Sequence, residues 1–166
     1  DETGNYDATL NNGAMWTNDS KFGPYAVDFN DGYITQNSIL DVFPPNGAID
    51  FWFKPSVTFD SNAPANWNLV NKMNSLFPEH YMWAALDSDT GKLHYTIYKG
   101  TGTDYRIISI TDTWLANTWY HITLTWGARG TELWVDGVKE GSTSFTGVPD
   151  TGSQFDFTIG AGYTGA

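Results

Sequence analysis

The sequence contains no cysteine and few basic residues, and both shortages exclude kinds of site or partner. Without cysteine, the chain can form neither a disulfide nor a thiolate metal site. Its 8 lysines and arginines stand against 19 acidic residues, which gives a net charge of −11 at pH 7. A field of that sign repels polyanions, so we expect no binding to nucleic acid. Neutral ligands and cations are compatible with it.

Long apolar runs and helical patterns are also missing. No apolar run approaches the roughly 18 residues that a membrane-spanning helix needs, so we expect no membrane insertion. No window of about 11 residues keeps apolar side chains at helical spacing without an interrupting Gly, Pro or β-forming residue. The chain starts at Asp1 and not at methionine, as a processed secreted chain would, and we predict an extracellular or cell-surface protein.

Aromatic residues, by contrast, are abundant. The 166 residues include 8 Trp, 9 Tyr and 10 Phe, which is more than the core of one domain needs. A chain of this length has room for one β-sandwich, so we interpret residues 1–166 as a single domain. The surplus of rings is the first indication that some of them face outward toward a ligand.

Strand patterns recur along the chain at intervals of about 8–12 residues, as in β-sandwiches. In "GAIDFWFKP" the apolar side chains at 49, 51 and 53 alternate with their neighbours, and Pro55 ends the run. A hairpin is predicted in "YMWAALDSDTGKLHYTIYKG", with its turn between Asp87 and Gly91. Further strands are expected in "AVDFNDGYITQ", "YRIISI", "VKEGSTS" and "FDFTIG". The predicted fold class is therefore all-β, a two-sheet antiparallel β-sandwich.

The stretch "WYHITLTWGARGTELWVDG" shows the alternation most clearly. Trp126 is in phase with Ile122 and Leu124, so we expect it in the core. Trp134 is out of phase with Leu133, which predicts that it lies on the opposite face of the sheet. This one hairpin therefore supplies rings to both sides of its sheet.

Six segments occur in the order and spacing of a known family. They are "GNYDATLNNGAMW", "YAVDFNDGYIT", "GAIDFWFKP", "WLANTWYHITLTW", "TELWVDGVKEGS" and "FTIGAG". Together they cover nearly the whole chain, which resembles the laminin G-like jelly-roll domains of the concanavalin A-like lectin and glucanase superfamily. The resemblance implies two stacked antiparallel sheets and a carbohydrate, glycoconjugate or protein ligand.

The resemblance also implies two features that the residues do not settle. Such domains often hold one structural calcium ion but require no cofactor, and acidic turns such as those at Asp28 and Asp31 or at Asp87 and Asp89 permit a calcium site without fixing its ligands. Such domains generally end with one more strand after the Ile-Gly motif, whereas this sequence stops at Ala166. We expect a truncated last strand, with a strand supplied by a partner as the alternative.

Catalysis is not expected. Glycosidases need two carboxylates about 5–9.5 Å apart across the scissile bond, and those of this sandwich carry them in a Glu-x-Asp-x-x-Glu strand motif. None of the four glutamates begins such a motif; they are Glu2, Glu79, Glu132 and Glu140. Asp87 and Asp89 are in phase but lie in a predicted turn, where aspartate bonds to its own backbone.

The predicted hairpin of residues 81–99 is the candidate ligand platform. If Leu93, Tyr95 and Ile97 face the core, then His94 and Tyr98 face out. On the partner strand we expect the smaller side chains inward, which leaves Tyr81 and Trp83 outward beside them. Trp67, near the end of the predicted loop "PSVTFDSNAPANWN", is a further candidate contact. The alternative interpretation is that this loop covers the rings and that they only pack.

These observations predict a non-catalytic, lectin-like module that attaches an extracellular protein to a neutral polysaccharide or glycoconjugate. Tyr and Trp suit such a ligand because they combine an apolar ring with a polar tip. The alternative is a structural or adhesion module whose outward rings contact other proteins in a surface assembly.

Overall fold

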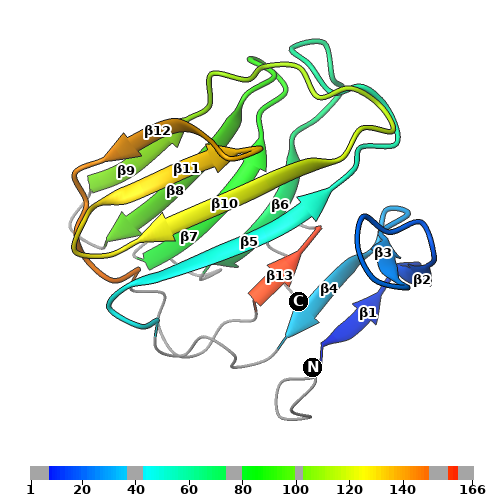
Figure 1. The fold of residues 1–166 in the computed structure, drawn as a ribbon, viewed down its shortest axis with the longest axis horizontal. Helices are drawn as coiled ribbons and strands as arrows, with labels where there is room; N and C mark the ends of the chain where they lie inside the picture. The colour runs from blue at the N-terminus through cyan, green and yellow to red at the C-terminus, as the bar shows by residue number, and fades with distance from the viewer. Residues whose placement is uncertain (1–7, 37–42, 74–79, 100–102, 150–156, 161–166) are drawn as a thin grey trace.

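A computed structural model describes residues 8–36, 43–73, 80–99, 103–149 and 157–160. These ranges hold thirteen β-strands and no helix. The strands form two stacked antiparallel sheets and a short two-stranded ribbon at one side of them (Figure 1). The prediction of an all-β, two-sheet antiparallel sandwich is confirmed. Among the described residues no helix is long and apolar enough to span a membrane.

The larger sheet has seven strands, and its order differs from the chain order. From one edge to the other it consists of β1 (Thr9–Asn11), β4 (Tyr33–Gln36), β13 (Phe157–Ile159), β6 (Trp67–Met73), β7 (His80–Leu86), β8 (Leu93–Lys99) and β9 (Thr103–Ile108). The described part of the predicted strand "FDFTIG", Phe157–Ile159, thus lies inside the sheet, hydrogen-bonded to β4 and β6. The expectation about a further closing strand concerns residues 161–166, which lie outside the described residues.

The smaller sheet has four strands, in the order β12 (Val138–Thr143), β11 (Thr131–Val135), β10 (Tyr120–Trp126) and β5 (Gly47–Phe53). It contains the stretch "WYHITLTWGARGTELWVDG", and the structure confirms both expectations for its rings. Trp126 is buried, and its indole N–H donates to the Pro44 carbonyl oxygen at 2.9 Å. Trp134 lies on the other face and donates to Glu132 at 3.1 Å. Asp136 and Gly137, with φ values of 50° and 78°, form the predicted turn.

The core fills the space between the two sheets, and strand alternation selects its members. From the larger sheet come Met82, Ala84, Leu86, Leu93, Tyr95 and Ile97. From the smaller sheet come Ile122, Leu124, Trp126, Leu133 and Val135. Trp114, in the connection from β9 to β10, is fully buried and donates to the Gly91 carbonyl oxygen at 2.9 Å. The inward choice predicted for the hairpin of residues 81–99 is therefore confirmed.

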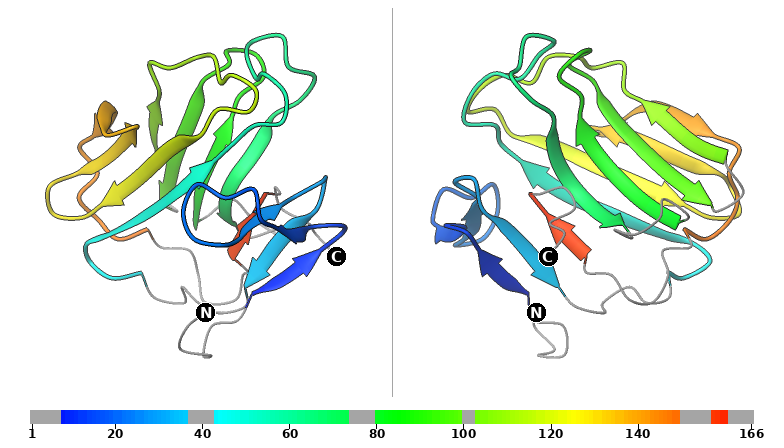
Figure 2. Two further views of the ribbon diagram at one scale, coloured as in Figure 1. Left: turned by 45° about the vertical axis from the view of Figure 1, so that its right-hand side comes forward. Right: turned by 180° about the vertical axis from the view of Figure 1, so that it is seen from behind.

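The ribbon consists of β2 (Met15–Thr17) and β3 (Ala26–Asp28), which pair with each other. Its strands are continued along the chain by β1 and β4, and the chain bends between ribbon and sheet (Figure 2). Positive φ values at Asn12, Asn30 and Asp31 make this bend. Gly32 is required there, since a Cβ at that position would lie 2.3 Å from the Asn11 carbonyl oxygen. Backbone geometry thus accounts for the Asn-Asp-Gly run.

Candidate functional site

The side of the seven-stranded sheet that faces away from the core carries the candidate site, and we call it the outer face. In the β7–β8 pair, Trp83 lies opposite Thr96 and Ala85 lies opposite His94. Both pairs alternate with the buried pairs of the core, so they project to the other side. Tyr98, two residues beyond Thr96, takes the same side. The strand register therefore places Trp83, His94 and Tyr98 on one face, as predicted.

A β-bulge in β6 adds two asparagines to this face. The register with β7 shifts between Asn68 and Val70, so that Asn68 lies opposite Ala85 and Asn71 lies opposite Trp83. Residues three apart in a regular strand point to opposite sides, but the extra residue, Leu69, brings both asparagines to the same side. Strict alternation over "NWNLVN" cannot anticipate this, and sequence reasoning missed both residues. The only available signal was the concentration of asparagine around Trp67.

Asn68 fixes the orientation of the Trp83 ring. The indole Nε1–H donates to the Asn68 side-chain oxygen at 2.6 Å. Trp83 itself is half-buried, so part of the ring stays accessible on the outer face. A ring that is held by a hydrogen bond loses little conformational freedom when a ligand stacks on it.

Three buried polar atoms surround Trp83 without a hydrogen bond to any described part of the chain. They are Asn71 Oδ1, Thr96 Oγ1 and His94 Nε2. Their residues are only 2%, 0% and 8% exposed, respectively. Asn71 and Thr96 flank Trp83 in one cross-strand row, and His94 precedes Thr96 on the same side of β8. Leaving such a group unpaired costs about 1–3 kcal/mol. Because each atom is covered, a ligand pairs with it only when the side chains above it move aside.

Burial also determines the charge of His94. Desolvation lowers the pKa of its imidazole, Asp87 opposes that effect, and Arg106 and Lys92 add to it. The ring is therefore neutral at pH 7, with one nitrogen that donates and one that accepts. The sequence placed His94 on the outer face, where it lies, but not in the buried state that the structure gives it.

Arg106 and Asp104 mark the β9 edge of the outer face. Arg106 follows Thr96 in the same cross-strand row, and Asp104 lies opposite Tyr98. The guanidinium and the carboxylate are 3.4 Å apart, and both side chains are exposed. The positive charge at this edge is therefore offset by its neighbour.

Tyr81 and Trp67 are the other two predicted site residues. Tyr81 occupies the register position opposite Tyr98, and its side chain lies outside the described part of the chain. Trp67 was predicted in a loop, but it is the first residue of β6 and lies opposite the core residue Leu86. Its ring packs on Phe59, with centroids 4.9 Å apart. The structure thus separates Trp67 from the outer face, because the strand starts earlier than the loop composition suggested.

Fixed structural contacts occupy several of the carboxylates. Asp87 Oδ1 accepts from the Thr90 backbone N–H at 3.0 Å and from its hydroxyl at 2.8 Å, which is the local turn bonding expected from the sequence. Glu140 accepts from the Thr111 backbone N–H at 2.8 Å. The described residues contain no cluster of three or more His, Cys, Asp or Glu side chains able to hold a metal ion. A structural calcium stays a prediction from the resemblance alone.

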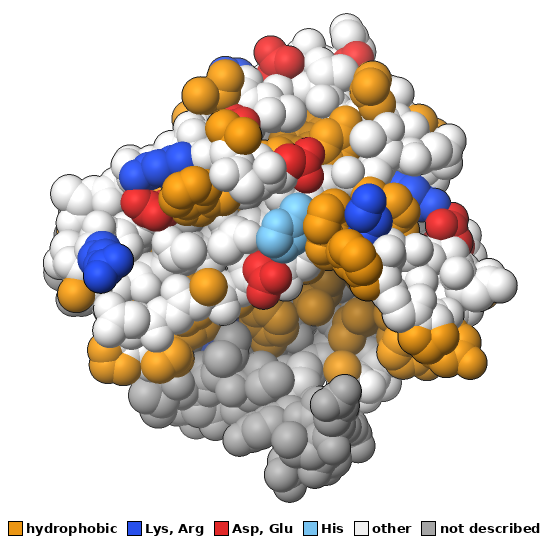
Figure 3. Space-filling view, viewed as in Figure 1, with side chains coloured by type: hydrophobic (Ala, Val, Ile, Leu, Met, Phe, Trp, Pro, Cys, Tyr) orange, Lys and Arg blue, Asp and Glu red, His pale blue; other side chains and the backbone are white. Residues whose placement is uncertain are grey.

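The opposite surface of the molecule, on the four-stranded sheet, has a different chemistry. Trp52 stacks on His121 with ring centroids 4.8 Å apart and an interplanar angle of 21°. The imidazole Nε2 lies 3.2 Å from the Asp50 carboxylate. Figure 3 shows this surface, where hydrophobic side chains gather beside acidic ones toward the β2–β3 ribbon. The rings here are supported by carboxylates of the chain itself.

Comparison with protein families finds one match over most of the chain. A laminin G family model, described as the concanavalin A-like lectin/glucanases superfamily, matches residues 27–166. No curated protein matches the chain by sequence.

Solved structures with the same fold include proteins of several kinds. Domain 4 of an extracellular arabinanase from Geobacillus stearothermophilus, solved with arabinotriose, has a TM-score of 0.75 at 16% identity, over 99% of this chain and 79% of that one. A structure of botulinum neurotoxin type C, a toxin whose cell entry depends on two ganglioside molecules, has a TM-score of 0.61 at 14% identity and covers 98% of this chain and 40% of that one. Domains LG4–5 of the mouse laminin alpha1 chain have a TM-score of 0.56 at 12% identity and cover 76% of this chain and 31% of that one. At these identities the likeness establishes the fold.

Proposed function

The chain belongs to the concanavalin A-like lectin/glucanase superfamily, and we propose that it is a non-catalytic module of an extracellular protein that binds a neutral glycan on the outer face. The observation that carries the proposal is the grouping of Trp83 with three buried, unpartnered polar atoms. A folded protein seldom leaves several such groups side by side, and a ligand that pairs them removes their cost.

A sugar supplies both kinds of contact that this grouping offers. Its ring carries C–H faces that stack on an indole, and Trp83 is held in place for such stacking by Asn68. Its hydroxyls both donate and accept, so they match the Asn71 oxygen, the Thr96 hydroxyl and the neutral His94 imidazole once binding uncovers these atoms. Each completed hydrogen bond contributes about 0.5–1.5 kcal/mol.

Charge supports a neutral ligand in preference to an acidic one. The chain carries a net charge of −11, which opposes the approach of an anion. The cationic group at the edge of the outer face, Arg106, is paired with Asp104. The polar atoms around Trp83 belong to an amide, a hydroxyl and a neutral imidazole, and none of them is a cation.

The comparisons support a carbohydrate ligand by analogy, while the neutral character of the glycan is argued from the charge of this chain alone. The arabinanase domain that shares this fold was solved with arabinotriose, and the neurotoxin interacts with gangliosides. Both proteins contact carbohydrate. Extracellular placement is proposed by the same analogy, since the arabinanase that shares this fold is extracellular.

The non-catalytic part of the proposal is supported by the described carboxylates. Glu132 accepts hydrogen bonds from Trp134 and Lys139, and Glu140 caps backbone amides near Thr111. A glycosidase needs two free carboxyl groups facing one bond. A reducing-end assay on each polysaccharide that the protein binds checks this point, and release of new reducing ends would contradict it.

The test of glycan binding compares two tryptophans in matched settings. Trp83 and Trp134 are both half-buried on the side of a sheet away from the core, and each donates its indole N–H to a neighbouring side chain. We expect affinity electrophoresis on neutral polysaccharides to show retention of the native protein and of Trp134→Ala. Trp83→Ala should lose at least about 10-fold in affinity, since stacking of one ring contributes about 1.4 kcal/mol or more.

A second variant separates loss of binding from loss of folding. Trp83→Phe keeps a ring in the strand but lacks the N–H that Asn68 orients, so its affinity should lie between those of the native protein and Trp83→Ala. Circular dichroism on each variant confirms the sandwich. No retention of the native protein on any neutral polysaccharide, or equal retention of Trp83→Ala, contradicts the proposal. A stable oligomer without glycan affinity would favour the adhesion module instead.

A further inference from the structure

The β2–β3 ribbon and the loop that joins its strands concentrate large exposed apolar side chains to a degree not found elsewhere in the described residues. Within eleven residues of chain they expose Met15 (51%), Trp16 (68%), Phe22 (70%) and Tyr25 (66%). The other large exposed apolar side chains are spread over separate strands and connections. Large rings are costly to leave in water, so a cluster of them on one small element indicates a contact surface.

Two of these rings form a single platform. Trp16 lies opposite Val27 in the ribbon, and Tyr25, two residues before Val27, is on the same side by alternation. Met15 points to the other side. Trp16 and Tyr25 are diagonal neighbours, a distance that aromatic side chains span, and together they line a hollow of about 270 Å³. The hollow is open to solvent and almost wholly apolar, so it offers a surface for stacking and not an enclosing pocket.

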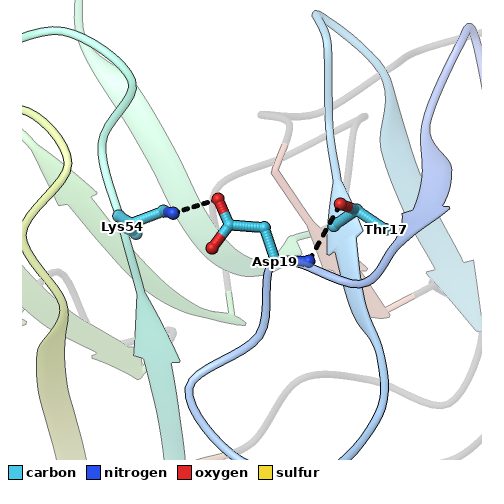
Figure 4. A network of polar contacts seen from close by, with 3 residues as sticks. All are labelled: Thr17, Asp19 and Lys54. Atoms are coloured by element: carbon cyan, nitrogen blue, oxygen red, sulfur yellow. Dashed lines mark hydrogen bonds and ion pairs between the residues drawn. The ribbon is translucent and has the colours of Figure 1, made fainter.

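The ribbon is held in place by contacts on the loop that joins its strands. Asp19 in this loop forms an ion pair with Lys54 beyond β5, and the Asp19 backbone N–H donates to the Thr17 hydroxyl at 3.2 Å (Figure 4). Phe22 packs edge-on against Trp52 of β5, with ring centroids 5.5 Å apart. The Lys21 ammonium lies 4.9 Å from the same ring. These contacts orient the ribbon before any ligand arrives, so binding costs little further ordering.

We propose that Trp16 and Tyr25 form a second glycan-binding platform, separate from the outer face. The proposal goes beyond the proposed function and rests on it only for the class of ligand, a neutral saccharide. The C–H face of one sugar ring stacks on one of the two aromatic rings, while the sugar hydroxyls stay in solvent.

Area and charge favour a sugar over the other occupants of such a surface. Complete burial of the two platform rings removes roughly 300–500 Å², which is enough for one sugar ring. A stable protein interface needs about 800 Å² from each partner and would have to extend beyond the platform. Lys21, the cation of this loop, lies over Trp52, so the platform offers no positive charge to a phosphate or an anionic lipid.

Two platforms on one module change how it binds a polysaccharide. A polysaccharide is able to engage both platforms of one molecule or to bridge two molecules, and the second contact then forms at a raised effective concentration. A short oligosaccharide fills one platform only. We therefore expect the module to bind polymer more tightly than it binds oligosaccharides of the same sugar.

The experiment compares four proteins on polysaccharide and on a short oligosaccharide of the sugar that retains the native chain. They are the native protein, the double variant Trp16→Ala/Tyr25→Ala, the single variant Trp83→Ala, and the control Val57→Ala/Leu115→Ala, which removes two exposed apolar side chains far from the ribbon in sequence. Calorimetry gives affinity and stoichiometry, and circular dichroism gives the melting temperature. The mutated rings are exposed, so the ribbon variant should melt close to the native temperature.

We expect the ribbon variant to lose about 10-fold in affinity for the polysaccharide. Its stoichiometry for the oligosaccharide should correspond to one binding platform per molecule. The control should bind both ligands as the native protein does. Equal binding by the ribbon variant and the native protein, with loss only in Trp83→Ala, overturns the second platform and leaves the proposed function standing. Loss in the ribbon variant with none in Trp83→Ala supports the platform and overturns the outer-face site. Light scattering on the same proteins provides a further check. A native oligomer that the ribbon variant fails to form, without a change in glycan binding, also overturns the platform.

Discussion

Each sheet carries a histidine and a tryptophan on the side that faces away from the core, yet the two surfaces treat their polar groups differently. On the four-stranded sheet, His121 lies 3.2 Å from Asp50, and Trp134 donates to Glu132. On the seven-stranded sheet, His94 is buried without a hydrogen-bond partner at Nε2 among the described residues.

The difference lies in the neighbours that the strands supply. Carboxylates stand beside the histidine and the tryptophan of the smaller sheet, and they accept what those rings donate. An amide and a hydroxyl, those of Asn71 and Thr96, flank the tryptophan of the larger sheet and are themselves buried without partners. These polar groups of the smaller sheet therefore have hydrogen-bond partners within the chain, whereas those of the larger sheet are stabilised when another molecule supplies the missing hydrogen bonds. Four changes test this contrast.

The largest effect is expected from Asn68→Ala. It removes the acceptor that orients Trp83 and leaves the indole N–H unpaired, so glycan affinity should fall about 10-fold or more and stability by about 1–3 kcal/mol. Glu132→Ala is the matched change on the other sheet, where it removes the acceptor of Trp134. We expect it to leave glycan affinity within about 2-fold. Calorimetry and urea unfolding measure both quantities, and equal affinity losses in the two variants would contradict the contrast.

Thr96→Val should move affinity and stability in opposite directions. It replaces an unpaired buried hydroxyl with an apolar group of similar shape, so stability is expected to stay equal or rise by up to about 1 kcal/mol. Affinity should fall by about 3- to 10-fold, because the ligand loses a hydrogen bond. Thr123→Val on β10 is the control, and we expect it to change neither the glycan affinity nor the stability by much. A stability loss above about 1 kcal/mol in Thr96→Val would show that its hydroxyl is paired within the protein.

His94 should make stability sensitive to acid. Burial keeps the folded-state pKa of this imidazole below the unfolded value of about 6.5. As the pH falls through 6.5 the unfolded state takes up the proton first, so stability present above that pH is lost progressively below it. His94→Gln should flatten the profile below about pH 6.5. Urea midpoints across that range provide the measurement, and identical slopes for native protein and His94→Gln would contradict the prediction.

The smallest effect is expected on the inner side of the same sheet. The Tyr95 hydroxyl is buried in the core without a hydrogen-bond partner among the described residues, and burial raises its pKa. Tyr95→Phe should therefore be neutral or stabilise the protein by up to about 1 kcal/mol, with glycan affinity unchanged. Thermal unfolding measures the stability of this variant, and calorimetry measures its glycan affinity. Together they distinguish an unpaired group in the core from the unpaired groups on the outer face. A marked loss of stability would show that the hydroxyl has a partner.

Much of the fold and part of the site follow from the order of residues along single strands. A strand projects its side chains alternately to two sides, so Met82, Ala84 and Leu86 identify the core side and Trp83 the other without knowledge of any partner strand. The Asp136–Gly137 turn is equally local, because its backbone needs positive φ values. Membership of the sandwich family follows from such local patterns in series.

What required the tertiary structure is everything that depends on contacts between distant strands. The bulge at Leu69 turns Asn68 and Asn71 to the same side, and Trp67 leaves the predicted loop to pack on Phe59. The burial of His94 and the missing partners of Asn71 and Thr96 depend on which side chains three different strands bring together. Alternation is a property of one chain segment, whereas register, burial and hydrogen-bond pairing are properties of neighbours in space, and that is why the sequence indicates the aromatic face but not the polar atoms that make it a candidate for binding.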